Sequence, residues 1–449
     1  MKKNRTIITN LKGLLKDHFS IHFKLCVIIL VLFIPWQHNI AQDSNLNYVS
    51  TKTYKIATNS SLPHSSGDVS SGVTYYDGLG RPIQQIAHKQ SGTGGDLITH
   101  IEYDPLGRQE KSFLPFERTS GSLAFDANAQ SNVFSYYNSQ QFGNTQNPYS
   151  QTEFDSSPLN RVLKKAAPGN DWAMGNDHEV KYKYRLNSTN EVYQFSVTTS
   201  GSLPQLIYID TYPENQLSET ATYDENSPGG GVTKGSVVEY RDKLNRVILK
   251  RHYSSVTGRS TDTNPAFALD TYYIYDNFGN LAMVLPPKLS EQILVGGNLV
   301  GNHQILIDGL GYQYAYDHRN RLIRKKLPGK QMDFIAYDPL DRPIGVGPVQ
   351  SPFGDGALGT IRTKYDAFNR VVYAMWFPGW FGESTRQSME NIPAPTYSEN
   401  RTVNPTTING VTFGYTNDVS PMRGYHILTV NNYDDYSYPG APSSIPSNV

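Results

Sequence analysis

Apolar and polar positions recur along the chain as two short strands flanking a tight turn. Before the turns come runs rich in β-branched and aromatic residues, namely GVTYY, ITHIEY, GSVVEY, TYYIY, QYAY and FIAY. After the turns come PIQQIA, VLKKAA, VILKRHY, LIRKKL and VVYAMWF. Such runs, bounded by turn residues, predict β-strands. Prolines follow at a nearly constant distance, at Pro115, Pro168, Pro286, Pro328 and Pro378, and should end the returning strands because proline cannot donate to a β-ladder.

A repeated motif occupies each turn: Tyr-Asp, any residue, usually Leu or Phe, then Gly, Asn or Asp, then Arg and an apolar strand. Good copies span residues 76–83, 103–110, 316–323, 337–344 and 365–372. Looser copies span 154–163, 240–248 and 275–281, and a ninth at 433–436 keeps only the beginning. The Asp can accept hydrogen bonds from backbone N–H groups further along the turn, so the motif predicts a tight β-hairpin.

The residue before the arginine is the position where the turn restricts the backbone conformation most. Gly, Asn and Asp enter the left-handed region most readily, as a type I turn closed by a bulge requires. The predicted structural turn positions of the five good copies are Asp77, Gly80, Arg81, Asp104, Gly107, Arg108, Asp317, Asn320, Arg321, Asp338, Asp341, Arg342, Asp366, Asn369 and Arg370. We expect positive φ at the middle residue of each trio.

The motif resembles the YD repeats of bacterial RHS proteins and of teneurin ectodomains over most of residues 72–375. The opening copy also looks like the N-terminal domain that precedes YD repeats in secreted bacterial members. The resemblance implies an all-β fold, in which tandem antiparallel β-hairpins form a spiral, shell-like sheet behind an N-terminal β-rich domain. Copies between residues 275 and 365 lie 21 to 41 residues apart, which suits a spiral with variable loops better than a fixed-period propeller.

The N-terminus has the pattern of a targeting segment. Basic residues precede an apolar run at 25–36, which is shorter than the roughly 20 residues that a membrane-spanning helix needs. A signal peptide at 1–41, cut near Ala41, predicts a secreted or cell-surface protein that is not an integral membrane protein after cleavage. Beyond it we expect a linker at 42–71, the N-terminal β-rich domain at 72–230, YD repeats at 231–375, and an aromatic and proline-rich, truncated segment at 376–449.

Composition narrows the possible partners. Lysine plus arginine equals aspartate plus glutamate, at 40 each, so no overall basic field favours nucleic acid. Aromatic residues make up 12% of the chain, which argues against disorder. Because the lone cysteine, Cys26, lies in the apolar run, a mature chain cut after it could form neither a disulfide nor a thiolate metal site.

Motifs for catalysis are missing from the sequence. No HExxH or GxSxG occurs. We expect Asp177-His178-Glu179 to form a solvated loop, and the glycine-rich stretch at 92–96 to be a flexible connection, since it lacks the Lys-Ser/Thr ending of a phosphate loop. The prediction is therefore a protein that is not an enzyme, with no cofactor, no metal and no catalytic residue.

Two functions remain open. In the first, the chain is a structural, encapsulating shell, the N-terminal part of an RHS-type, polymorphic-toxin-like protein, whose partner is a C-terminal toxin or further repeats of the same polypeptide. The family's DPxG-type cleavage signature does not follow Phe377, and residues 104–107 match its letters only as a turn within a repeat. In the second, the chain is an adhesin that binds glycans or polyanions through the motif arginines and tyrosines.

The arginines and the aromatic residues have competing interpretations. The motif arginines could bind polyanions, or they could form structural pairs with the motif Asp or stack on a motif tyrosine. The cluster of Trp376, Phe377, Trp380 and Phe381 would be a contact site if exposed and a plug of the shell if buried.

Overall fold

The computed structural model describes residues 46–55, 67–199, 203–226, 235–253, 268–295, 298–393 and 396–441. The predicted signal peptide and Cys26 lie outside these ranges. No helix in the described ranges is long and apolar enough to cross a membrane.

Most described residues in regular structure belong to two antiparallel sheets. The five-stranded sheet has the order β1 (Asn47–Tyr54), β2 (Val69–Tyr76), β3 (Pro82–Ala87), β4 (Asp96–His100) and β6 (Phe116–Arg118). The sixteen-stranded sheet contains β5 (Lys111–Phe113), β7 (Tyr149–Phe154), β8 (Val162–Ala166), β9 (Val180–Leu186), β12 (Ser218–Tyr223), β13 (Val237–Arg241), β14 (Val247–Tyr253), β15 (Ala268–Tyr275), β16 (Leu281–Leu285), β19 (Tyr312–Tyr316), β20 (Leu322–Lys326), β21 (Met332–Tyr337), β22 (Pro343–Gln350), β23 (Leu358–Tyr365), β24 (Val371–Pro378) and β27 (His426–Val430). The prediction of an all-β fold made of antiparallel hairpins is confirmed.

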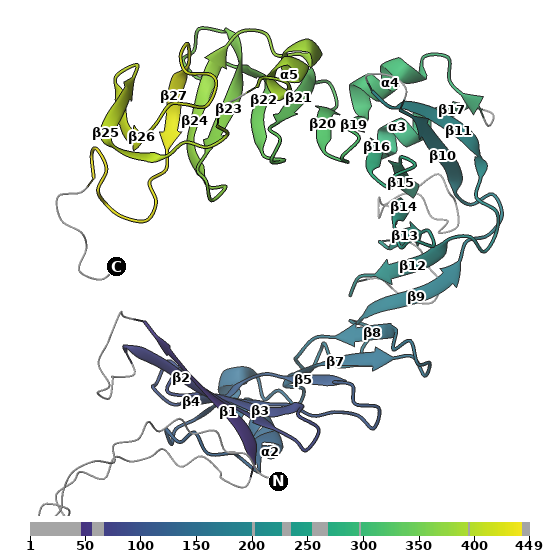
Figure 1. The fold of residues 1–449 in the computed structure, drawn as a ribbon. Helices are drawn as coiled ribbons and strands as arrows, with labels where there is room; N and C mark the ends of the chain where they lie inside the picture. Colours follow the sequence, from purple (N-terminus) through teal and green to yellow (C-terminus); the bar gives the residue numbers. More distant parts are fainter. Residues whose placement is uncertain are drawn as a thin grey trace, which may run out of the picture.

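The long sheet follows an open arc (Figure 1). Its strands pair in chain order from β5 at one end to β27 at the other, apart from the small pairs inserted between them. A right-handed strand twist turns each strand relative to the last, and bulges increase that twist, so a sheet of this many strands cannot remain flat. The sheet therefore coils.

Strand pairing crosses two of the predicted domain boundaries. Within the predicted linker 42–71, β1 pairs along its whole length with β2, from Asn47 opposite Tyr76 to Tyr54 opposite Val69. The sheet also continues past residue 230, because β12 pairs with β9 on one side and β13 on the other. Backbone pairing alone therefore places no break between 72–230 and 231–375.

The motif turns have the predicted backbone. Positive φ is confirmed at Gly80 (79°), Gly107 (78°), Asn320 (58°), Asp341 (64°) and Asn369 (63°). The looser copies share it, at Asn160, Asn245 and Gly279. Where the turn joins two strands, the register shifts just before the residue that precedes the motif aspartate, as a bulge requires.

The prolines after the turns behave differently from one copy to the next. Strands β8, β16 and β20 stop before Pro168, Pro286 and Pro328, as expected. Pro378 is instead the last residue of β24, where it lies opposite Gly359 of β23. A proline at the end of a strand loses only one ladder hydrogen bond, so the strand can include it.

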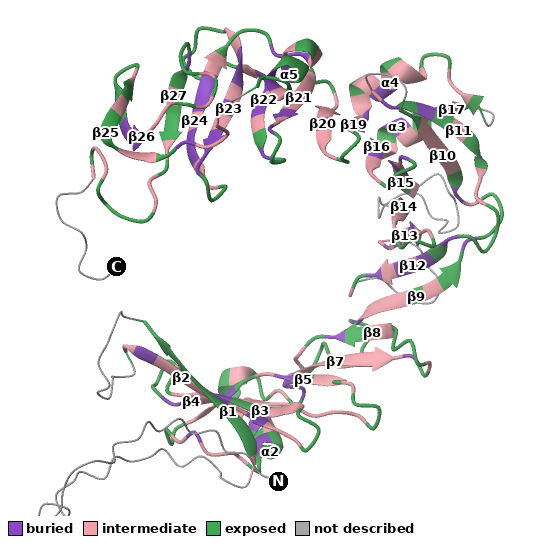
Figure 2. Cartoon of the chain, viewed as in Figure 1, coloured by how far each residue is buried: buried purple, intermediate pink, exposed green. Residues whose placement is uncertain are grey.

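Elements inserted between the hairpins contribute to the hydrophobic cores, together with strands of the sheets. They are α2 (Ala129–Tyr137), the 3-10 helix η1 (Gln140–Phe142), β10 (Tyr193–Thr198), β11 (Gln205–Thr211), α3 (Pro287–Gln292), β17 (Leu294–Val295), β18 (Asn298–Leu299), α4 (His303–Leu310), α5 (Glu383–Glu390), β25 (Arg401–Ile408) and β26 (Val411–Tyr415). In Figure 1, β10, β11 and α4 lie on the outer side of the arc. Buried residues gather where such elements meet the sheet, whereas β7 is only half-buried (Figure 2).

These insertions explain the uneven spacing of the motif. Between residues 275 and 365 the longest interval, from Tyr275 to Tyr316, contains α3, β17, β18 and α4. Leu289 of α3 and Ile307 of α4 are fully buried in one cluster with β12–β16. A two-faced sheet needs cover on at least one face to exclude water from its apolar side chains, and the insertions provide that cover.

Candidate functional site

The motif aspartate holds its own turn through both carboxylate oxygens. Oδ1 of Asp317 accepts hydrogen bonds from the backbone N–H groups of Arg319 and Arg321, each at 2.9 Å, and Oδ2 accepts one from Nε of Arg321 at 2.8 Å. The same three bonds occur at Asp77, Asp104, Asp242, Asp338 and Asp366. One carboxylate thus satisfies three donors that would otherwise face the tight turn unpaired.

These hydrogen bonds set the ionisation of the carboxylates. The backbone N–H of Arg81 is the main reason why the pKa of Asp77 lies below its usual value. Burial alone would raise the pKa of Asp317, but hydrogen bonds from the backbone and side chain of Arg321 outweigh it, so that this pKa is also lowered. The carboxylates of Asp77 and Asp317 are therefore charged at neutral pH.

The motif arginine joins its hairpin to the next one. Its guanidinium lies over an aromatic ring of the following hairpin, 4.3 to 5.1 Å from the ring centre. The pairs are Arg81 with Tyr103, Arg108 with Phe154, Arg161 with Tyr184, Arg246 with Tyr275, Arg321 with Tyr337, Arg342 with Tyr365, and Arg370 with Tyr433. The structural interpretation of these arginines, pairing with Asp and stacking on Tyr, matches the contacts observed.

The tyrosine of the following hairpin adds a second contact through its hydroxyl group, and we call the arginine and tyrosine contacts together the joint between two hairpins. This hydroxyl donates to the carbonyl of the residue that follows the preceding motif arginine, at 2.8 to 3.1 Å. The donor and acceptor pairs are Tyr103 and Pro82, Tyr184 and Val162, Tyr275 and Val247, Tyr337 and Leu322, Tyr365 and Pro343, and Tyr433 and Val371. Tyr316 donates in the same way to Leu281, although Asn280 replaces the arginine there. Ring and hydroxyl together fix the spacing between hairpins.

The residue with positive φ takes part in this joint as well. Nη1 of Arg342 donates to Oδ1 of Asn369 at 3.0 Å, and Nη1 of Arg321 is 2.8 Å from Oδ1 of Asp341. Where Asn280 stands in place of arginine, its amide donates to Asn320 at 3.1 Å. Asn or Asp therefore supplies both a left-handed backbone and an acceptor for the neighbouring hairpin, whereas Gly supplies only the first.

The incomplete ninth copy is part of this series. Arg370 lies over the ring of Tyr433 and also forms an ion pair with Asp434 at 2.7 Å. Asp434 itself has φ of 76°. The incomplete copy at 433–436 thus joins the last complete hairpin through the same kinds of contact.

The turn tips carry a row of apolar side chains that point into solvent. The exposed residues at the fourth motif position or its equivalent are Leu79, Leu106, Leu159, Leu244, Phe278, Leu340 and Phe368. Strand periodicity gives no indication of this row, because these residues lie in turns. Their exposure follows from the turn geometry, which directs the tip away from both strands.

A family model described as a domain of unknown function, DUF6443, matches residues 50–186. The match begins within β1 and ends with the last residue of β9, so it includes strands of both sheets. The N-terminal domain expected at 72–230 overlaps this range without coinciding with it. No curated protein matches the chain.

Solved structures of Tc toxin complexes are similar at low identity. The crystal structure titled TcdB2-TccC3 covers 74% of this chain with a TM-score of 0.42 and 13% identity. The one titled TcdB2-TccC3-TEV covers 70%, with a TM-score of 0.42 and 14% identity. A Tc holotoxin pore of Photorhabdus luminescens covers 70%, with a TM-score of 0.41 and 13% identity. This chain spans only 13 or 14% of the length of those chains.

The predicted aromatic cluster is divided by the structure. Trp376 and Phe381 are buried, Phe377 is half-buried, and Trp380 is 64% exposed. Phe381 packs with Ala336 and Met389 beneath α5. The four residues therefore form neither one contact surface nor one plug.

The end of the glycine-rich stretch at 92–96 is more ordered than expected. Asp96, which is also the first residue of β4, is fully buried. Its carboxylate lies 2.9 Å from Nδ1 of His88 and 3.2 Å from Nη2 of Arg118. The connection is therefore anchored at this end by a buried polar cluster.

The acidic stretch at 177–179 is only partly the solvated loop that was expected. Asp177 and His178 are exposed, but Glu179 is buried and accepts a hydrogen bond from the N–H of Gly175. Within the described ranges, no three His, Cys, Asp or Glu residues are grouped so as to hold a metal ion.

A tyrosine-lined cavity lies over β9 and β12–β14. Its volume is about 490 Å³. The aromatic lining is Tyr182, Tyr184, Tyr223, Tyr240 and Tyr253, and the cationic residues at its wall are Arg161, Lys183 and Arg185. Tyr240 donates a hydrogen bond to Glu191 at 2.9 Å, and Arg185 pairs with both Glu191 and Glu219. These lining residues lie on β9, β12, β13 and β14 and next to β8, so they are far apart in the sequence and no local motif marks them as a group.

We expect substitutions of Asn369 to rank in the order Asp, Gly, Val. Asn369→Asp keeps the acceptor for Arg342, as Asp341 does for Arg321, and should be nearly neutral. Asn369→Gly loses that acceptor but relieves the left-handed backbone, so the two effects largely offset each other. Asn369→Val should cost about 1–2 kcal/mol of unfolding free energy from backbone strain alone. Thermal and urea melts measure the ranking, with Thr429→Val, on the exposed strand β27, as a control that should change little. An Asn369→Val chain as stable as wild type would contradict the turn geometry.

We expect the carboxylate of Asp317 to make stability fall in acid. Because the pKa of Asp317 is lowered in the folded chain, its contribution is present above its unfolded pKa of about 4 and is lost as the pH falls through the folded value. Asp317→Asn should lower the unfolding free energy at pH 7 by about 1 kcal/mol, with a smaller difference from wild type at pH 3. Urea melts at both pH values test this. Asp171→Asn, at an exposed turn position, is the control and should change the unfolding free energy little at pH 7.

Proposed function

We propose that this chain is a structural shell protein, the N-terminal part of an RHS-type, toxin-shell polypeptide that is secreted and encloses a cargo segment or seals against further repeats. The observation that carries the proposal is the joint between successive hairpins. The Asp–Arg–aromatic contacts repeat along the arc and use the charge of the motif residues for assembly, which leaves the arginines little capacity to bind a ligand. We expect a wall built in this way to enclose a cargo segment rather than to bind a ligand through its arginines.

The geometry of the long sheet's last strand supports the same proposal. The sheet ends at β27, which pairs with β24 on one side and with no other described strand. An unpaired edge presents backbone N–H and C=O groups that can receive another strand. Further hairpins added there would extend the wall with the same joint that connects Arg370 to Tyr433.

Small-angle X-ray scattering of the purified chain tests the open shell. A compact domain of this length would have a radius of gyration of about 22 Å. An open arc places mass far from its centre, so we expect a clearly larger radius and a broad pair-distance distribution. The same measurement after removal of residues 1–45 controls for the N-terminal segment. A radius near the compact value would contradict an open shell.

The second candidate is an adhesin that binds glycans or polyanions. The tyrosine-lined cavity favours it, because aromatic faces flanked by cationic side chains can stack on sugars and pair with acidic substituents. The motif arginines favour it less, since Arg321 and Arg342 each pair with their turn aspartate at 2.7 Å and are largely buried.

Retention on heparin and on glycan arrays separates the two functions. If the arginines serve assembly, changing Arg321 and Arg342 together to Met should lower the melting temperature and leave retention unchanged. If they bind ligand, the folded variant loses retention. The double Lys variant is the matched control: it keeps both charges but loses the planar fork that pairs with Asp, so it should also melt earlier and should retain any charge-driven binding. Binding lost in a Tyr182→Ala variant would instead assign an adhesin function to the cavity.

A further inference from the structure

One arginine in the long sheet has a charge that nothing else in its surroundings neutralises. Arg362, on β23, is only 8% exposed, and it lies opposite Gly345 of β22 and Met375 of β24. Its guanidinium stacks on the ring of Phe377 at 3.9 Å. Its Nε is buried without a hydrogen-bond partner, and across the described ranges no carboxylate pairs with the side chain.

The other buried cations of the described chain are all paired. Arg342 pairs with Asp338 at 2.7 Å, Lys364 with Glu399 at 2.9 Å, and Arg386 with Glu383 and Glu390. An unpaired buried charge is costly, and proteins normally compensate it. Burial alone lowers the pKa of Arg362 to about 10, so the guanidinium is still protonated at neutral pH. Arg362 thus carries a positive charge without a counter-ion.

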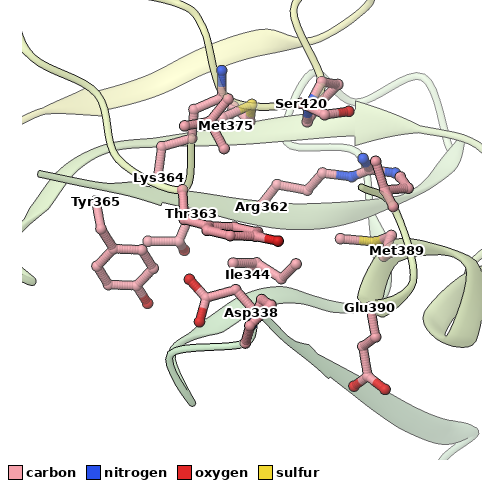
Figure 3. Close-up of a pocket in the computed structure, with 15 residues that line it drawn as sticks. Asp338, Ile344, Arg362, Thr363, Lys364, Tyr365, Met375, Met389, Glu390 and Ser420 are labelled. Atoms are coloured by element: carbon pink, nitrogen blue, oxygen red, sulfur yellow. The ribbon is translucent and has the colours of Figure 1, made fainter. Parts of the chain in front are cut away.

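A cavity lies next to this guanidinium. Its volume is about 40 Å³, and Figure 3 shows Arg362 running along it, in this view between Ser420 and Met389. A water needs about 10–15 Å³ by this measure, so the space holds a few waters or one small polar group. Ile344, Met375 and Met389 contribute apolar wall, whereas Ile392 and Ser420 are exposed at its rim.

The acidic residues at the cavity wall already have partners. Asp338 is bound to the backbone and side chain of Arg342. Glu390 accepts from Arg386 at 2.7 Å and from the backbone N–H of Tyr337 at 3.0 Å. Neither carboxylate is therefore free to turn toward Arg362, and the missing negative charge must come from outside this group of residues.

We infer that the cavity at Arg362 is a binding site for a carboxylate carried on a short apolar stem. The fork of guanidinium N–H groups suits the two oxygens of a carboxylate, and a charge-assisted pair is strong in a site shielded from water. The apolar wall suits a stem of a few carbon atoms. Such a group could come from a free short-chain carboxylic acid or from a glutamate side chain of another polypeptide.

Methionine methyl groups give a local test of this site. The full chain, labelled with ¹³C at its methionine methyls, is titrated with sodium butyrate, with butyramide and with sodium chloride at matched ionic strength. We expect the Met375 and Met389 signals to shift in a saturable way with butyrate only, with a dissociation constant on the order of millimolar. Met283, buried in the distant cluster under α3 and α4, is the internal control and should not move. A capped Ala-Glu-Ala peptide, compared with its Gln counterpart, distinguishes a protein side chain from a free acid.

Substitution of the arginine completes the test. Arg362→Leu should abolish the butyrate shift and should raise the melting temperature of the ligand-free chain, because it removes an unpaired buried charge. Arg342→Leu is the matched control, because Arg342 is equally buried but paired with Asp338. This substitution should lower the melting temperature. The inference is overturned if neither butyrate nor the Glu peptide shifts Met375 and Met389, or if the shifts persist in the Arg362→Leu chain.

Discussion

Each hairpin turn depends on one aspartate that satisfies three donors, and the rest of the architecture depends on that turn. The carboxylate orients the arginine four residues later in the regular copies, and the oriented guanidinium then reaches the next hairpin. Removing the carboxylate would free the arginine and leave two turn N–H groups without an acceptor. The arginine needs this restraint because a flexible side chain would lose much of its stacking energy to conformational entropy. The same contacts thus stabilise each turn and connect successive hairpins of the wall.

The wall is stabilised differently from a globular domain. Each joint contributes on the order of 1 kcal/mol, from a cation–π contact and one tyrosine hydrogen bond, so stability grows by repetition rather than from one large core. Apolar burial is concentrated where inserted elements pack on the sheet, as with Leu289 and Ile307, or Phe381 and Met389. Insertions of different length can occur between hairpins because the joint constrains only the turn and the following tyrosine.

The net charge of the whole chain is zero, and in the structure charged side chains form local ion pairs. Motif arginines face their own aspartates, and the buried Lys364 and Arg386 have carboxylate partners. Arg362 departs from this pattern although it lies on the same strand as Lys364. Its neighbours are a glycine, two methionines and Phe377, none of which carries a negative charge. The unpaired Arg362 therefore distinguishes the cavity from the surrounding ion pairs, such as that of Lys364 on the same strand.

The sequence alone determined the turns. Positive φ at Asn320, Asp341 and Asn369 follows from residue type within a six-residue motif, because this preference acts over a few bonds. Contacts between segments could not be derived in this way. The partner of Arg370 is Tyr433, beyond a helix and four strands whose lengths no local rule fixes. Strand β1 lies within the predicted linker. Its pairing with β2, rather than an apolar pattern of its own, makes it a strand. The unpaired state of Arg362 likewise depends on which carboxylates the folded chain brings near it and which of these already have partners, and only the tertiary structure decides that.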